Sequence, residues 1–311
     1  GHSGRSALAG FGKKLSDSSN MTIFRVLLEE CRPKQWIKNS LVVVAPLTSK
    51  SLFESSTLLS TIAIFCSMCA VSSATYFVND VRDREADAQH AKKQRRPIAS
   101  GRLSVRTAYI GIAVLLSVGL AMAALVSNKS FLVVVAYLSL TTAYSFRLKH
   151  VPIVEIVIVA SGFVIRAFLG AVAAEVPPSS WFMASIFAGS LFVATRKRYA
   201  ELIGSESAGR DTRKVLSFYS GASLASASRL FGALFVLAYI SWCIEVGPLG
   251  SIATILRLAS VLPLGAAVLR YEKQSEGQLG ESPEDLLTED RAMKVWGAIW
   301  FLCVSVSLYI A

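Results

Sequence analysis

The chain has 311 residues, 53% of them apolar, and its mean hydropathy of +0.51 is too high for a soluble domain of this length. Its net charge of +11 is of the kind found in nucleic-acid-binding proteins, but the cations flank apolar segments, where membrane orientation and anionic lipids account for them. We therefore predict an all-α polytopic membrane protein that contacts membrane lipids and binds no nucleic acid.

The chain begins with residues 1–20, which are polar and rich in Gly and Ser and predict a flexible tail, native or added. A single membrane domain is predicted over residues 21–311, with about nine membrane-crossing helices. The first, Ile37–Phe53, is the weakest, because Pro46 interrupts a short apolar run. The other spans are predicted at Leu58–Val78, Ala108–Val126, Phe131–Phe146, Val151–Ala173, Trp181–Thr195, Leu230–Ile244, Leu249–Leu269 and Val295–Ile310.

The positive charges are distributed unevenly between the loops that join these spans. If the N-terminus is cytoplasmic, the inner segments hold the clusters Arg82–Arg106 and Arg196–Arg229, whereas the outer loops hold only Lys50 and Lys129. Lys and Arg gather on the cytoplasmic side of membrane proteins. The distribution predicts a multi-pass cell-membrane protein with a cytoplasmic N-terminus and polar site, and with its C-terminus outside.

An amide and three carboxylates follow the second predicted span, at Asn79, Asp80, Asp83 and Asp87. On a helix that continues past Val78, these side chains fall within one arc of roughly 100°. Carboxylates on one face repel one another unless a cation joins them, and hard oxygen ligands suit Mg²⁺, which commonly accompanies a diphosphate. The pattern predicts a site for Mg²⁺ and a diphosphate; the alternative is a solvated, charged helix end.

Two ionisable residues, Glu155 and Arg166, lie within the predicted span Val151–Ala173. A charge in the hydrocarbon costs on the order of 3 kcal/mol, so such residues normally face a polar cavity. They are about three helical turns apart and share a face without pairing directly. Arg166 either binds an anion or fixes a neighbouring helix, and the sequence leaves both alternatives open.

The segment Asn79–Asp87, followed by Arg95–Gly101, resembles the UbiA superfamily of intramembrane prenyltransferases. The resemblance implies about nine membrane helices around a central cavity, in keeping with the hydropathy pattern. It also implies a polar site at the cytoplasmic end of the cavity and a lateral opening to lipid.

Four further motifs resemble one branch of this superfamily, the decaprenyl-phosphate phosphoribosyltransferases. The branch implies transfer of 5-phosphoribose from phosphoribosyl pyrophosphate to decaprenyl phosphate, with release of diphosphate. The product would be the lipid-linked precursor of cell-wall arabinan. The motifs are Arg32–Asn39, Tyr144–Lys149, Ser161–Ala167 and Lys197–Leu202.

The chain departs from the wider superfamily after the span Trp181–Thr195, where typical members carry a second Asp-rich motif. Here three cations, Arg196, Lys197 and Arg198, are accompanied by one carboxylate, Glu201. A second, symmetric Mg²⁺ site is therefore not expected. A cationic pocket instead favours a soluble donor with an additional phosphate and a lipid that is itself a phosphate.

The resemblance and the charge pattern together assign Asp80, Asp83 and Asp87 as catalytic residues and, with Asn79, as ligands of Mg²⁺. No general base is required, because a lipid phosphate is already ionised at neutral pH. For the candidate cations the alternative is a topology or headgroup charge, and for the tyrosines an interfacial position. The candidates for substrate binding are Lys38, Asn79, Arg96, Tyr144, Lys149, Arg166, Lys197, Arg198, Tyr199 and Glu201.

Two other functions remain as alternatives. One is prenyl transfer from a prenyl diphosphate to an aromatic acceptor, and the other is a polytopic transporter, against which the short outer loops and the surface position of the carboxylates argue. The sequence leaves open the prenyl length, the number of metal ions and whether the chain forms a homo-oligomer.

Overall fold

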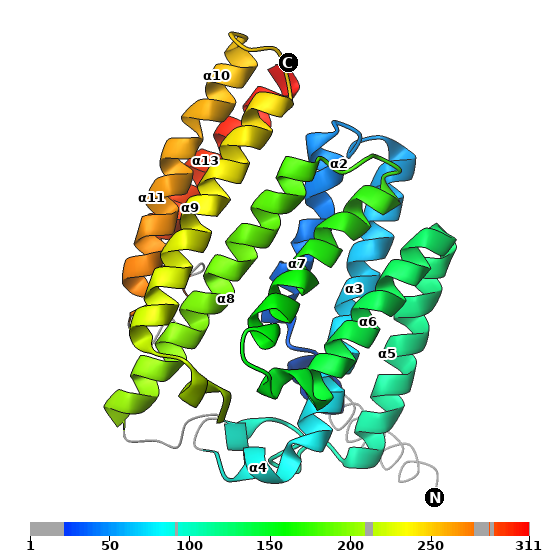
Figure 1. The fold of residues 1–311 in the computed structure, drawn as a ribbon. Coiled ribbons are helices and arrows are strands. Elements are labelled where there is room, and N and C mark those ends of the chain that lie inside the picture. The colour runs from blue at the N-terminus through cyan, green and yellow to red at the C-terminus, as the bar shows by residue number, and fades with distance from the viewer. Residues whose placement is uncertain (1–21, 91–92, 209–213, 277–285, 287–288, 311) are drawn as a thin grey trace, which may run out of the picture. The chain divides into compact units, whose positions relative to one another are not determined.

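The computed structural model describes residues 22–90, 93–208, 214–276, 286 and 289–310 (Figure 1). These residues form α-helices, 3-10 helices and turns, and no strand occurs among them. The prediction of an all-α chain is confirmed. The predicted tail, residues 1–20, lies outside the described residues.

The chain forms two compact units, one comprising Gly1–Trp36 and Cys66–Met122 and the other Ile37–Phe65 and Ala123–Ala311. Helix α3 (Ser55–Arg82) is continuous and contributes to both. The expectation of one membrane domain over residues 21–311 stays a prediction.

The first unit brings together the N-terminal helix, residues 22–31, and the second half of α3. It also contains α4 (Arg84–Ala88), η2 (Lys93–Arg95) and most of α5 (Val105–Val126). A buried hydrophobic cluster in its core contains Val26, Phe77, Ile98, Leu103 and Ala108. The core therefore joins the N-terminal helix, α3, α5 and the loop that precedes α5.

The second unit contains the remaining helices. Helix α8 packs along α7 and α9, while α13 packs on α10 and α11 (Figure 1). Apolar side chains fill the contacts, for example Ile156, Leu191 and Leu224 on α7, α8 and α9. The elements are most of η1 (Pro33–Val43), α2 (Val44–Thr48), α6 (Asn128–Phe146), η3 (Leu148–His150), α7 (Val154–Ala173), α8 (Ser180–Ala208), η4 (Lys214–Phe218), α9 (Gly221–Glu245), α10 (Ile252–Ala259), α11 (Val261–Gln274) and α13 (Arg291–Ile310).

Seven helical segments of the described chain are long and apolar enough to cross a membrane: α3, α5, α6, α7, α9, the α10–α11 pair and α13. They match seven of the predicted spans and confirm a multi-pass membrane protein. Helix α8 is not among the seven, because Arg196, Lys197 and Arg198 follow closely on its uncharged stretch Trp181–Thr195.

The predicted span Leu249–Leu269 differs from the structure because it is divided. Helix α10 ends at Ala259 and α11 begins at Val261, with the backbone N–H of Ser260 donating to both Leu256 O and Arg257 O at 3.1 Å. Pro263 lies in the first turn of α11, where its missing N–H and its ring disfavour a continuous helix through this point.

The weakest predicted span, Ile37–Phe53, is not one α-helix in the structure. A 3-10 helix, η1, leads into the short helix α2, which contains Pro46. Long 3-10 helices are uncommon because their hydrogen bonds are poorly aligned, so tertiary contacts must hold this one. One such contact is at Gly170 of α7, where an added Cβ would lie 2.1 Å from the carbonyl oxygen of Val42.

Replacing Gly170 with Ala should therefore lower the free energy of unfolding by about 1–3 kcal/mol, because α7 and η1 would be forced apart. Thermal unfolding of the purified protein in detergent measures the loss. Gly265→Ala in α11 is the matched control, since a Cβ there meets no atom within 4 Å. Equal melting temperatures for Gly170→Ala and the unmodified protein would contradict the close approach.

Candidate functional site

The acidic segment lies at the end of α3 and in α4. The predicted continuous helix is interrupted at Asp83, since α3 ends at Arg82 and α4 begins at Arg84. The backbone hydrogen bonds nevertheless continue through the break, from Asp83 N to Asn79 O and from Asp87 N to Asp83 O, each at 2.8 Å. The break therefore keeps the approximate helical register on which the sequence prediction depends.

Asp80 and Asp87 are brought together by one guanidinium group. Arg96 Nη1 lies 3.0 Å from Asp80 Oδ1 and 2.6 Å from Asp87 Oδ2, and both aspartates are buried. Lys93 Nζ lies 3.5 Å from the other oxygen of Asp87. Three of the predicted site residues, Asp80, Asp87 and Arg96, thus form one ionic cluster in the first unit.

The loop after η2 positions Arg96. Its backbone is folded by hydrogen bonds from Ser100 N to Arg96 O and from Leu103 N to Pro97 O, both at 2.9 Å. Ile98 and Leu103 are buried in the core of the first unit. Gly101 has a φ of 76°, in the left-handed region where glycine avoids the steric cost of a Cβ.

Arg32 is a second cation at Asp80 and is not among the site residues predicted from the sequence. Its Nη2 forms an ion pair with Asp80 Oδ2, and its Cζ lies 5.0 Å from the centroid of the Tyr76 ring. Its φ of 54° is unusual for a non-glycine residue and costs on the order of 1–3 kcal/mol. The signal was present, because Arg32 begins one of the motifs that carry the family resemblance.

The segment around Arg32 is tied to α3 by side-chain hydrogen bonds. Trp36 Nε1 donates to Ser73 Oγ at 3.1 Å, and Ser73 Oγ donates to Cys31 O at 3.0 Å. Because Ser73 and Asp80 are two turns apart on α3, these bonds hold the Arg32 backbone beside the acidic end of that helix.

Glu30 also lies at this cluster and, like Arg32 and Lys93, is not among the site residues predicted from the sequence. It is 1% exposed and lies beside Asp80. Burial, reinforced by the negative charge of Asp80, raises the pKa of Glu30 well above its ordinary value. No motif includes it, and a pair of adjacent Glu residues in a short N-terminal helix has no sequence signature that marks either as part of a site.

The cluster has the donor chemistry that Mg²⁺ requires. Among the described His, Cys, Asp and Glu side chains, no three are already arranged as a metal-binding group. Instead, a guanidinium nitrogen lies between Asp80 and Asp87, and both buried oxygens of Glu30 lack a hydrogen-bond partner among the described residues. Carboxylate oxygens are the ligands that Mg²⁺ prefers, so Asp80, Asp87 and Glu30 supply donor atoms of a type that suits this ion.

A second ionic cluster is centred on Arg198 of α8. Arg198 Nη2 lies 2.9 Å from Glu155 Oε2 of α7, and Nη1 forms an ion pair with Glu201 Oε2. The hydroxyl of Tyr144, at the end of α6, lies 3.4 Å from Nη2. The structure thus brings Tyr144, Arg198 and Glu201 together, and it adds Glu155, which the sequence analysis had placed within a span without a partner.

Arg166 lies elsewhere in the second unit and is engaged with protein groups. Its Nε donates to Asn39 Oδ1 at 2.8 Å, Nη1 to Gly162 O at 2.8 Å and Nη2 to Tyr137 OH at 2.7 Å. The side chain is buried. These bonds join α7 to η1 and α6, so the geometry favours the alternative in which Arg166 fixes its neighbours.

The remaining candidates are spread over several elements. Tyr199 lies beneath Arg196, whose Cζ is 4.5 Å from the ring centroid, and Arg196 Nε donates to Ser275 Oγ at 2.7 Å. Lys38, Lys149 and Lys197 are half-buried on η1, η3 and α8. Asn79 is half-buried in the last turn of α3.

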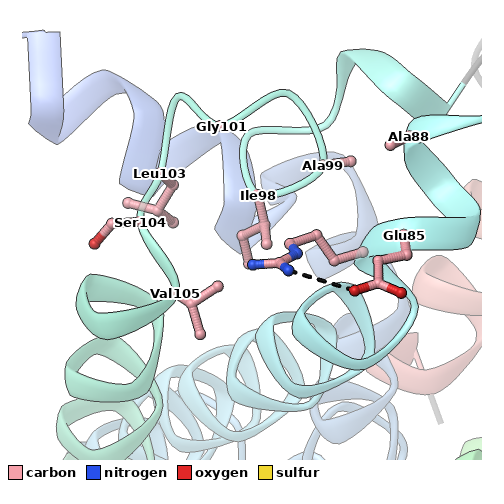
Figure 2. A pocket seen from close by; sticks show the side chains of 9 residues that line it. Glu85, Ala88, Ile98, Ala99, Gly101, Leu103, Ser104 and Val105 are labelled. Carbon is pink, nitrogen blue, oxygen red and sulfur yellow. Dashed lines mark ion pairs between the residues drawn. The ribbon is translucent and has the colours of Figure 1, made fainter.

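Figure 2 shows a pocket of about 330 Å³ on the first unit, outside the ionic cluster. The side chain of Glu85 is directed toward that of Arg84, with 3.6 Å between their charged atoms. None of the predicted site residues lines this pocket. Its lining consists of Arg84, Glu85, Ala88, Ile98, Ala99, Gly101, Leu103, Ser104 and Val105.

Comparison with known sequences identifies the family. The sequence profile of the UbiA prenyltransferase family matches residues 40–282. The chain belongs to this family. The predicted UbiA-like fold is confirmed by solved structures: a UbiA homolog from Archaeoglobus fulgidus bound to GPP and Mg²⁺ has a TM-score of 0.69 at 18% identity, covering 92% of this chain and 99% of that one.

Two relatives of this UbiA family member cover nearly the whole chain. A protein named decaprenyl-phosphate phosphoribosyltransferase from Mycobacterium tuberculosis is 37% identical over 91% of this chain and 94% of its own length. Another of the same name from Corynebacterium glutamicum is 36% identical over 91% of this chain and 87% of its own length. The similarity therefore covers the acidic segment and the Arg198 cluster alike.

Replacing Arg166 with Ala should lower the free energy of unfolding by about 2–3 kcal/mol, because Asn39, Gly162 and Tyr137 lose a buried donor. Arg166→Lys should recover little of this lost stability, since a lysine ammonium cannot reproduce the planar set of guanidinium donors. Tyr137→Phe, which removes one acceptor, should cost less. A stable Arg166→Ala protein with weakened binding of phosphoribosyl pyrophosphate would instead establish Arg166 as a phosphate ligand.

Proposed function

We propose that this membrane enzyme transfers 5-phosphoribose from phosphoribosyl pyrophosphate to decaprenyl phosphate or a similar polyprenyl phosphate. The observation that carries the proposal is the similarity over 91% of the chain to relatives named for this activity. The cationic segment on α8, in place of a second Asp-rich motif, supports it, because both proposed substrates carry phosphates beyond the diphosphate leaving group.

The reaction breaks the bond between ribose C1 and the diphosphate oxygen and forms a bond between C1 and an oxygen of the lipid phosphate. The bonding pair leaves with the diphosphate, and inversion at C1 follows if the lipid phosphate attacks from the opposite face. The nucleophile is already an anion, so no proton has to be removed. The protein's contribution is therefore to hold two anionic substrates in line and to stabilise charge.

In this proposal Asp80, Asp83 and Asp87, assisted by Asn79, would hold Mg²⁺. The ion would neutralise negative charge on the departing diphosphate. Arg96, which already lies between Asp80 and Asp87, is positioned beside the same group and could donate hydrogen bonds to phosphate oxygens.

Arg32 would act beside Arg96. Its left-handed backbone and its packing over Tyr76 direct the guanidinium to Asp80. Two guanidinium groups at one carboxylate provide more donors than that carboxylate can accept, so the excess can bind a substrate phosphate.

On the second unit, Lys38, Lys149, Lys197 and Tyr199 are the proposed ligands of the 5-phosphate and of the lipid phosphate. The carboxylates of Glu155 and Glu201 neutralise the charge of Arg198. We therefore assign Arg198 the role of positioning Tyr144, in preference to binding a substrate anion directly. The distribution of Lys and Arg supports a cytoplasmic N-terminus and site, with the C-terminus outside.

Asp80→Asn and Asp83→Asn should each lower kcat by at least about 10²–10³-fold while the protein stays folded, because charge stabilisation at the leaving group is lost. The measurement is transfer of label from phosphoribosyl pyrophosphate into extracted lipid, with Mg²⁺ present.

The matched control is Glu85→Gln, an exposed carboxylate of α4 outside the proposed metal set, which should keep normal transfer. Near-normal turnover in Asp80→Asn would remove the metal assignment. Label transfer from a prenyl diphosphate to an aromatic acceptor, with none from phosphoribosyl pyrophosphate, would overturn the proposed reaction.

Lys197→Ala should raise KM for phosphoribosyl pyrophosphate about tenfold, the loss expected for one charge-assisted hydrogen bond, with a smaller effect on KM for the lipid. Lys129→Ala, an exposed cation in the first turn of α6, is the control and should change neither constant. An unchanged KM for the soluble donor would exclude Lys197 as its ligand.

A further inference from the structure

Glu30 is a buried carboxyl to which the mechanism above assigns no role. It belongs to the helix over residues 22–31 and is 1% exposed. Neither Oε1 nor Oε2 has a hydrogen-bond partner within the described part of the chain. The neighbouring Glu29 shows the ordinary arrangement, because its carboxylate is exposed and accepts two hydrogen bonds of 2.7 Å from Arg102.

The surroundings of Glu30 do not supply what a buried carboxylate requires. Asp80, Arg32 and Arg96 are its charged neighbours. Arg32 directs its ion pair to Asp80, and Arg96 directs its Nη1 to Asp80 and Asp87. In its ionised form Glu30 would be a buried charge without an ion pair, which is strongly unfavourable. It therefore either holds a proton, in keeping with its raised pKa, or requires a further positive group.

A divalent cation at Asp80 would supply this group. Glu30 presents two oxygens of the hard type that Mg²⁺ and Mn²⁺ prefer, beside a carboxylate already proposed to hold the metal. The helix over residues 22–31 is packed into the core of the first unit through Val26 and cannot easily carry Glu30 into water. The two carboxyl oxygens of Glu30 therefore stay at the acidic cluster.

We propose that Glu30 is a further ligand of the divalent cation at the acidic segment, contributed by the N-terminal helix and not by the Asn79–Asp87 motif. The inference rests on the proposed function, because it requires that Asp80 holds a metal. An additional carboxylate increases the negative charge of the ligand set and so raises affinity for the ion. It also makes metal binding link the N-terminal helix to the end of α3.

The test uses Mn²⁺ as a paramagnetic substitute for Mg²⁺, bound to the full-length purified protein in detergent. Titration followed by electron paramagnetic resonance gives the dissociation constant, and the coupling to ¹⁷O-labelled water gives the number of water ligands. Glu30→Gln should weaken Mn²⁺ binding by at least about tenfold, since even the outer partners of metal ligands have effects of this size. In this variant one more water should bind Mn²⁺ than in the unmodified protein, in the place of the Glu30 carboxylate.

Thermal unfolding separates this role from a structural one. Without metal, Glu30→Gln should be at least as stable as the unmodified protein, because an unpartnered carboxyl is replaced. With Mn²⁺, its rise in melting temperature should be smaller, as mass action requires for a weaker ligand. A loss of stability that is equal with and without metal, at unchanged affinity, would show a packing role and overturn the inference.

Glu29→Gln is the matched control, with the same substitution one residue away, and should leave the Mn²⁺ constant and the water count unchanged. Glu30→Ala is a second variant and should show the same loss of affinity if the carboxylate itself is the ligand.

The two proposals fail in different ways. If the unmodified protein binds no Mn²⁺ with or without phosphoribosyl pyrophosphate, the metal-dependent function fails together with the inference. If it binds Mn²⁺ and Glu30→Gln binds equally well with the same water count, only the role of Glu30 is overturned.

Discussion

The pairing of Asp80 with two arginines organises the candidate site. Arg32 reaches Asp80 from the segment before η1, and Arg96 reaches it from the loop before α5. Moving charges from water into a protein interior is costly, so such a cluster contributes more to a defined arrangement than to net stability. The same arrangement requires a left-handed backbone at two positions. At Arg32 this conformation is unfavourable, whereas at position 101 it is occupied by a glycine.

In the second unit, too, buried arginines are compensated by polar groups that neighbouring elements contribute. Arg198 is buried between Glu155 and Glu201, and Arg166 is buried among an amide, a hydroxyl and a carbonyl. In each case an apolar helix carries a charge that would be unfavourable alone and is compensated by a neighbouring helix. The polar residues of the spans thus specify which helices pack together.

Much of the fold could be predicted because a membrane span is defined by length and hydropathy alone. The prediction was less accurate where backbone geometry responds to neighbours. The 3-10 helix η1 depends on the absence of a side chain at Gly170, and the division of α10 from α11 depends on the position of Pro263. The acidic motif was recognisable because its spacing places the carboxylates on one face, although the break at Asp83 was not visible in that spacing.

The sequence by itself determined the class of protein, seven of its spans, the family and the acidic segment, since these depend on composition and on residues close together in the chain. Only the tertiary structure decided which charges meet. Arg96 forms ion pairs with both Asp80 and Asp87, and Glu30 lies beside Asp80. Arg166 donates hydrogen bonds to Asn39 and Tyr137. These pairs are up to 127 positions apart in the chain. No local pattern encodes such contacts, because they arise from the packing of whole helices.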